Sequence, residues 1–157
     1  MFKKNAKILL ILLVVALIVT GALCLCACDG LKDFGKPAPD EGSKSVSVVI
    51  GEQSYSLKTD AEYVQDLLVE MKDAGKIQYE FSTSQYGAYM TRLNDLSPSS
   101  SSEYIAFYHD IDDVELKEMQ YGEAIQKGGK NYFTSSRGVS SLPVRNGASY
   151  LFIIKSM

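Results

Sequence analysis

The side chains capable of acid–base or nucleophilic chemistry are few in this 157-residue chain. His109 is the single histidine, and the three cysteines are Cys24, Cys26 and Cys28, all near the start of the sequence. A serine hydrolase would need His109 as its base, yet the sequence contains no Gly-x-Ser-x-Gly motif. Because no acid, base and nucleophile form a recognisable set, we expect neither enzymatic activity nor a catalytic residue.

Carboxylates follow His109 closely, and such a cluster raises the question of a metal site. The run comprises Asp110, Asp112, Asp113 and Glu115. It lacks the glycine and the terminal bidentate glutamate, in register, of a calcium-binding loop. We therefore interpret it as a solvated acidic loop, with a weak cation site as the alternative, and we predict no metal ligand and no cofactor from the residues themselves.

Tyrosines are the side chains best suited to binding, since each offers a broad ring and one hydroxyl. The chain has ten tyrosines, six phenylalanines and no tryptophan. We predict a shallow site formed by strand ends and by the loops 82–86 and 110–122. Its candidate ligand-binding residues are Tyr86, Tyr89, Tyr104, Tyr108 and His109. Aromatic residues also pack half-buried strand faces, so a core role is the alternative for each tyrosine.

The beginning of the chain carries the pattern of an export signal. Three lysines and no acidic residue precede an uncharged apolar run over residues 8–27. This pattern is typical of a segment whose start stays in the cytoplasm. The run ends in Leu25-Cys26-Ala27-Cys28, which resembles the bacterial lipobox. We therefore predict a lipoprotein signal peptide over 1–27 and lipidation of Cys28, with an uncleaved signal anchor as the alternative.

Both alternatives place the remaining chain outside the cytoplasm, at the cell membrane. Without residues 1–27, 13 basic and 19 acidic side chains remain, a formal net charge of −6. An acidic surface disfavours nucleic acid, because binding requires compensating lysines and arginines. The expected partners are therefore the membrane, through the lipid anchor, and an unknown small molecule or surface protein. No cysteine follows Cys28, so the exported domain depends on its core and contains no disulfide.

A linker separates the anchor from the folded domain. Residues 29–44 contain two prolines, three glycines and mixed charges without an apolar period. We predict that 28–44 comprises the lipidated cysteine and a flexible linker, and that 45–157 is a single domain.

The domain alternates strand patterns with one helix pattern. Thr59 and Glu62 match a capping box, and apolar residues then recur at helical spacing, which predicts an amphipathic helix over 60–74. Gly75 is suited to end it. The predicted strands are 45–50, 55–59, 77–81, 86–93, 103–109, 123–127, 130–133 and 149–155. These elements predict an α+β fold, mostly antiparallel sheet with one packed helix.

The order of these elements, together with several short motifs, resembles the bacterial transcobalamin C-terminal-like domain family. The motifs are Thr59-Asp60-Ala61-Glu62, Tyr86-Gly87-Ala88-Tyr89-Met90, Leu93-Asn94-Asp95, Tyr104-Ile105-Ala106-Phe107-Tyr108 and Asn146-Gly147-Ala148-Ser149-Tyr150-Leu151-Phe152. Ile105 stands where the family tends to have a tryptophan. The resemblance covers roughly residues 45–155 and implies an exported, often lipid-anchored domain. A cobalamin-type ligand is implied by this resemblance alone.

Two functions are compatible with the sequence. The first is a membrane-anchored extracytoplasmic lipoprotein whose non-enzymatic domain binds a small molecule, such as a corrinoid-like compound, or a glycan. The second is a surface protein-interaction or structural module that docks a partner through an aromatic patch or a sheet edge. We favour the first, because the resemblance points to ligand binding.

Overall fold

The computed structural model describes residues 35–84 and 87–157 of the chain. The chain separates into two units, Met1–Lys36 and Pro37–Met157, and the second contains every described strand and helix. The predicted signal peptide (1–27) and Cys28 lie outside the described residues. Within the described ranges, no helix is both long and apolar enough to span a membrane.

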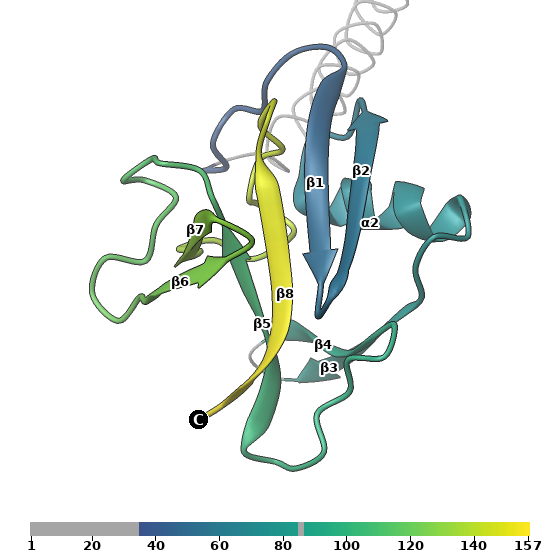
Figure 1. Cartoon of the computed structure of the whole chain (residues 1–157), viewed down its shortest axis with the longest axis vertical. Helices are drawn as coiled ribbons and strands as arrows, with labels where there is room; N and C mark the ends of the chain where they lie inside the picture. The colour runs from purple at the N-terminus through teal and green to yellow at the C-terminus, as the bar shows by residue number, and fades with distance from the viewer. Residues whose placement is uncertain (1–34, 85–86) are drawn as a thin grey trace, which may run out of the picture. The chain divides into compact units, whose positions relative to one another are not determined.

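A six-stranded sheet forms the body of the domain, in the order β2-β1-β8-β5-β7-β6 (Figure 1). Its strands are β1 (Lys44–Ile50), β2 (Gln53–Thr59), β5 (Glu103–His109), β6 (Ala124–Lys127), β7 (Lys130–Thr134) and β8 (Ser149–Ser156). Neighbours pair antiparallel except β1 and β8, which run parallel. A separate antiparallel hairpin consists of β3 (Tyr79–Ser84) and β4 (Gly87–Leu93).

The predicted α+β class is confirmed, because the described residues form mostly strands and a single short helix. The two predicted hairpins also form, β1–β2 and β6–β7. Glycines at positive φ make their turns, Gly51 at 56° in the first and Gly128 and Gly129 at 56° and 76° in the second. A left-handed backbone at these positions suits glycine, which has no Cβ to clash.

The helix α2 spans Val64–Asp73, so the predicted start at residue 60 is wrong. The segment before it is extended, because its backbone pairs with another segment: the Val144 N–H donates to the Glu62 carbonyl at 2.8 Å. Tyr63 is the N-cap, and its N–H donates to the Asp66 carboxylate at 3.1 Å. The predicted capping box of Thr59 and Glu62 therefore does not form.

The large sheet carries a hydrophobic cluster on each face. On one face, α2 lies behind β1 and β2 (Figure 1), and its buried residues Val64, Leu67, Leu68 and Met71 belong to the main core. On the other, the hairpin β6–β7 helps to enclose a smaller cluster made of Ala106, Tyr108, Tyr132 and Leu151. Because side chains alternate along a strand, Tyr108 faces the small cluster while Phe107 faces the main core.

The folded unit begins before the predicted boundary at residue 45. Asp40 forms an ion pair with Arg145 at 2.8 Å and accepts a hydrogen bond from the Asn146 N–H at 2.8 Å. The Lys44 ammonium is buried and donates to the Asp40 and Gly42 carbonyls. These contacts attach residues 40–44 to the loop before β8. The linker therefore ends upstream of residue 44, its predicted end.

Candidate ligand-binding groove

A groove opens between the β3–β4 hairpin, the main-core face of β5 and β8, and the loop that follows β7. Its volume is about 240 Å³. The lining side chains are mostly aromatic or aliphatic, so we call it the aromatic groove. They are Phe81, Tyr89, Met90, Ile105, Phe107, Val139 and Phe152, with Ser135, Arg137 and Gly138 completing the wall.

Stacked rings form the floor of the aromatic groove. Phe107 and Phe152 are register partners on β5 and β8, and their rings stack with centroids 4.9 Å apart. Phe107 also stacks on Tyr150, at 6.3 Å. Phe152 is buried, whereas Phe107 is half-buried and presents part of its ring to the groove.

The β3–β4 hairpin supplies the opposite wall. Phe81 is 41% exposed and Tyr89 is 54% exposed, although both line the groove. Pairing shifts register between Glu80 and Phe81, so that Thr91 becomes an extra residue on β4. Such a bulge bends a hairpin and redirects its side chains. The Phe81 ring also packs edge-on against Tyr79 at 5.2 Å.

A loop held by hydrogen bonds forms the polar wall. The Ser135 hydroxyl accepts from the Arg137 N–H at 3.1 Å and donates to the Arg137 carbonyl at 2.8 Å. The Val139 carbonyl accepts from the Gln65 N–H at 2.8 Å, which joins this loop to the first turn of α2. The loop is thus fixed on both sides of Arg137.

The structure brings one of the predicted binding residues, Tyr89, into the groove. Tyr86 lies outside the described residues. Tyr104 is exposed but belongs to the opposite face of β5, together with Tyr108. Tyr108, another predicted binding residue, is only 2% exposed, so it does not line a surface site.

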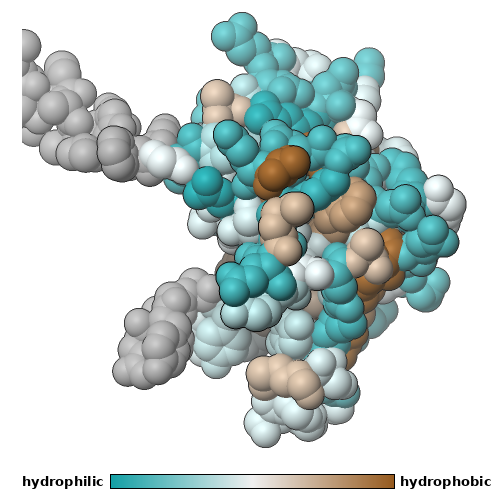
Figure 2. All heavy atoms as spheres, turned by 90° about the vertical axis from the view of Figure 1, so that its left-hand side faces the viewer, coloured by the Kyte–Doolittle hydropathy of each residue, from teal (hydrophilic) through white to brown (hydrophobic). Residues whose placement is uncertain are grey.

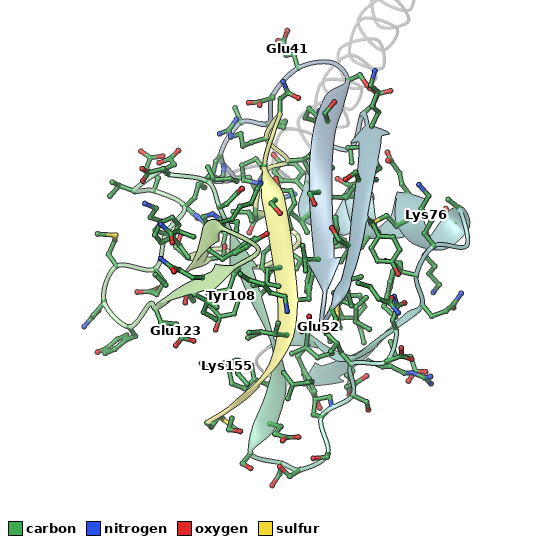
Figure 3. The ribbon with its side chains drawn as sticks, viewed as in Figure 1. Glu41, Glu52, Lys76, Tyr108, Glu123 and Lys155 are labelled. Carbon is green, nitrogen blue, oxygen red and sulfur yellow. The ribbon has the colours of Figure 1, made fainter. Side chains whose placement is uncertain are left out.

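Tyr108 is buried because the β6 side of the domain covers it. Its hydroxyl donates to Glu123, and Glu123 also pairs with Lys155 at 2.8 Å (Figure 3). Burial, reinforced by the neighbouring carboxylate, raises the pKa of the Tyr108 hydroxyl. On this side of the molecule, hydrophobic residues form small separate areas among hydrophilic ones (Figure 2). Tyr108 therefore serves the small cluster rather than a surface site.

His109 is likewise buried, with no exposed surface, and does not line the groove. Its Nε2 lies 2.9 Å from the Leu116 carbonyl and donates to it in the neutral form. Burial lowers the pKa of His109. The imidazole thus helps to hold the loop after β5 against the core.

The acidic run after His109 forms ion pairs of its own. Asp110 pairs with Lys130 at 2.6 Å and accepts from the Ser149 N–H, while Asp112 pairs with Lys117. In the part of the chain that the structure describes, no group of three His, Cys, Asp or Glu side chains could hold a metal ion.

Sequence reasoning missed most of the groove because it concentrated on tyrosines. The alternation along 103–109 does separate Ile105 and Phe107 from Tyr104 and Tyr108. It does not say which face is open. Arg137 sits in a polar segment without any period, where the sequence offers no signal.

Comparison with known proteins identifies no relative by sequence. No protein-family model matches the chain, and no curated protein matches it. Among solved structures, the domain is similar to one from Ruminococcus gnavus described as "a putative metal binding protein". The TM-score is 0.45 and the identity 16%, over 74% of this chain and 99% of that one.

Proposed function

We propose that this protein is a membrane-anchored extracytoplasmic lipoprotein whose folded domain binds a small, mainly apolar molecule in the aromatic groove. The observation that carries the proposal is the pair of half-exposed rings, Phe81 and Tyr89, lining a hollow whose floor is the Phe107–Phe152 stack. Exposed aromatic surface costs free energy in water, so its concentration around one hollow favours a ligand there.

The dimensions of the groove limit the size of that ligand. Pockets for drug-sized ligands have volumes of roughly 300–1,000 Å³. At about 240 Å³, the aromatic groove suits one or two rings, or a short apolar chain. A corrinoid, which the family resemblance suggests, is too large to be enclosed and would contact the groove with one edge. A sugar could stack a ring face on Tyr89, so glycans remain within the proposal.

Anchoring rests on the sequence of the first 28 residues. The lipobox-like Leu25-Cys26-Ala27-Cys28 motif supports lipidation of Cys28, and the basic start supports export. A lipid anchor would hold the binding domain near the outer surface of the membrane, where it could bind molecules from outside the cell. We propose that the groove binds its ligand without catalysing a reaction.

Two tyrosine substitutions test the proposal with a matched control. Full-length protein in nanodiscs of a neutral lipid is exposed to indole, naphthalene derivatives, cobinamide and short oligosaccharides, and its thermal unfolding is followed. At least one compound class should raise the unfolding temperature. Tyr89→Ser should reduce the increase, while Tyr121→Ser, which removes a ring 84% exposed and outside the groove, should not. Equal loss in both variants, or no increase with any compound, would contradict the proposal.

A sheet edge favours the second candidate function. β2 is the outermost strand on one side of the sheet, and its side chains Ser54, Ser56 and Lys58 are exposed. An edge strand can accept an extended segment of another protein through its backbone. A proline replacing Ser56 would then abolish partner capture from membranes, without altering small-molecule binding in the groove.

A further inference from the structure

We propose that the first part of β5 is an open sheet edge that binds an extended peptide, one of whose side chains enters the aromatic groove. The inference rests on the proposed function, because it uses the same groove, and it adds the class of ligand. That class is a peptide strand with an aromatic or large aliphatic residue at its centre. The strand would pair antiparallel with β5, the direction in which β7 already pairs with it.

β5 is paired unequally on its two sides. β8 pairs with all 7 of its residues, from Glu103 to His109, whereas β7 pairs with Tyr108 and His109 alone. β7 accordingly reaches only the upper end of β5 in Figure 1. β5 therefore lies inside the strand order of the sheet, yet over 103–107 no described strand pairs with its second side.

The unpaired backbone groups on this side belong to Ile105 and Phe107. The Met157 N–H donates to the Ser102 carbonyl at 2.7 Å, which makes these two residues a hydrogen-bonded pair one step beyond the β5–β8 ladder. Such pairs recur at every second residue of an antiparallel ladder, so the even-numbered residues of β5 face β8. The N–H and carbonyl groups of Ile105 and Phe107 therefore face away from β8, and in the described part of the chain they have no hydrogen-bond partner.

The segment after β7 leaves β5 because other groups bind its backbone. The Ser136 N–H donates to the Leu116 carbonyl at 2.9 Å, and the Thr134 carbonyl accepts from the Glu118 N–H at 2.9 Å. Both partners belong to the loop that follows β5. Extending β7 along β5 would break these hydrogen bonds, and a lost backbone hydrogen bond is costly. The edge is therefore left open to a different chain.

Complementary partial charges identify the occupant of this edge. Ile105 and Phe107 each present one N–H donor and one carbonyl acceptor, and residues two apart in a strand are about 6.8 Å apart. An extended peptide presents acceptors and donors at the same spacing, which a lipid chain or a fused-ring compound does not. Addition of a peptide strand to an unpaired sheet edge uses this match.

The aromatic groove would receive one side chain of the added strand. Ile105 and Phe107 line the groove, and directly opposed residues of paired strands place their side chains on the same face. The peptide residue opposite either one therefore directs its side chain into the groove, whose volume of about 240 Å³ suits a single aromatic or large aliphatic group. The neighbouring peptide residues would lie on the opposite face, where Tyr104 is 44% exposed.

A pentapeptide with a central tryptophan tests the inference. Two threonines stand on each side of the tryptophan, and both ends are blocked. The protein contains no tryptophan, so the fluorescence of the peptide reports binding directly. One analogue carries a methyl group on the tryptophan nitrogen, which would face β5. A second carries it on the nitrogen of the following threonine, which would face away. Full-length protein in dodecyl maltoside micelles is titrated, with empty micelles as the blank.

The unmodified peptide and the second analogue should bind with affinities within about twofold of each other. The first analogue should bind about tenfold more weakly, because it leaves a backbone carbonyl of β5 without its hydrogen bond. Ser56→Pro blocks the other open edge, on β2, and serves as the control. Its folding is checked by thermal unfolding, and it should bind all three peptides as the parent protein does.

Equal binding of the two analogues, or loss of peptide binding in Ser56→Pro, would overturn the inference. Indole, the side chain of tryptophan alone, separates this failure from that of the proposed function. If indole raises the unfolding temperature and the peptide does not bind, the open edge of β5 is not a peptide site and the groove still binds small molecules. If neither the peptide nor any compound of the panel binds, the proposed function fails as well.

Discussion

Phe107 and Phe152 face each other across β5 and β8, with ring centroids 4.9 Å apart and ring planes inclined by 25°. The pair belongs both to the core and to the floor of the aromatic groove. Its buried member, Phe152, is 1% exposed. One ring of the floor is therefore part of the buried core, and a ligand would contact a pair of rings that already stack on each other.

Truncating the buried ring should unfold the domain far more readily than truncating a wall ring. Phe152→Ala removes a core phenyl group and should lower the free energy of unfolding by about 3–5 kcal/mol. Phe81→Ala removes a half-exposed ring and should cost about 1 kcal/mol or less. Urea unfolding followed by circular dichroism gives both values. Similar losses in the two variants would mean that Phe152 is not part of a well-packed core.

The ion pair at Asp40 should protect the start of β1 and the residues before it from protease. Hydrogen bonding from the Asn146 N–H and then the Arg145 guanidinium lower the pKa of Asp40. Asp40→Ala should release the segment and speed tryptic cleavage after Lys44, whose ammonium is otherwise buried. Global stability should change by less than about 1 kcal/mol, since the pair is partly exposed. Cleavage after the exposed Lys76 provides the reference rate.

The protection that the Asp40–Arg145 ion pair gives should also depend on pH. Because the folded-state pKa of Asp40 is lowered, its contribution is present above the unfolded value near 3.8 and is lost as the pH falls through the folded value. Protection of Lys44 should therefore weaken only in strongly acidic solution, where trypsin is inactive and amide hydrogen exchange at residues 40–44 is measured instead. Loss of protection already at pH 6 would show that Asp40 does not hold it.

Alternation and turn chemistry made most of the strands predictable. The pattern over 103–109 and the Gly128-Gly129 turn depend on neighbouring residues, and both elements form where expected. The start of α2 was not predictable in this way, because residues 60–63 pair with the segment around Val144, far along the chain. The local capping pattern of Thr59 and Glu62 therefore does not set the start of the helix, because the long-range contact with Val144 does.

The site was harder to predict than the strands for a related reason. Tyr108 and Tyr89 both lie in predicted strands, yet one is buried beneath side chains from the β6 side and the other lines the groove. Which face of β5 is covered depends on where the β6–β7 hairpin folds, and that hairpin pairs with β5 at only two positions, Tyr108 and His109. Position in space, rather than residue type, separates the binding from the structural aromatic residues.

Lipidation should depend on one cysteine of three. Cells that express the full chain and are labelled with a palmitate analogue should incorporate label into the parent protein and into Cys26→Ser. Cys28→Ser should carry none, because Cys28 is the residue preceded by the small Ala27 and, at minus three, by Leu25. Label on Cys28→Ser, or an unprocessed precursor of full mass in the parent, would support the uncleaved signal anchor instead.

His109 should make the domain less stable in mildly acidic solution. Burial lowers its pKa, so the folded state binds the proton less tightly than the unfolded state, whose value is near 6.5. The contribution of neutral His109 to the free energy of unfolding is therefore fully present above pH 6.5, and it decreases as the pH falls below this value. Unfolding free energies measured at pH 7.5 and 5.5 should differ more for the parent protein than for His109→Gln.

Glutamine has no titrating group but retains a donor for the Leu116 carbonyl. Its packing loss affects both pH values equally, so the comparison concerns the change between them. An identical change in the two proteins would show that His109 is protonated as easily in the folded state as in the unfolded chain.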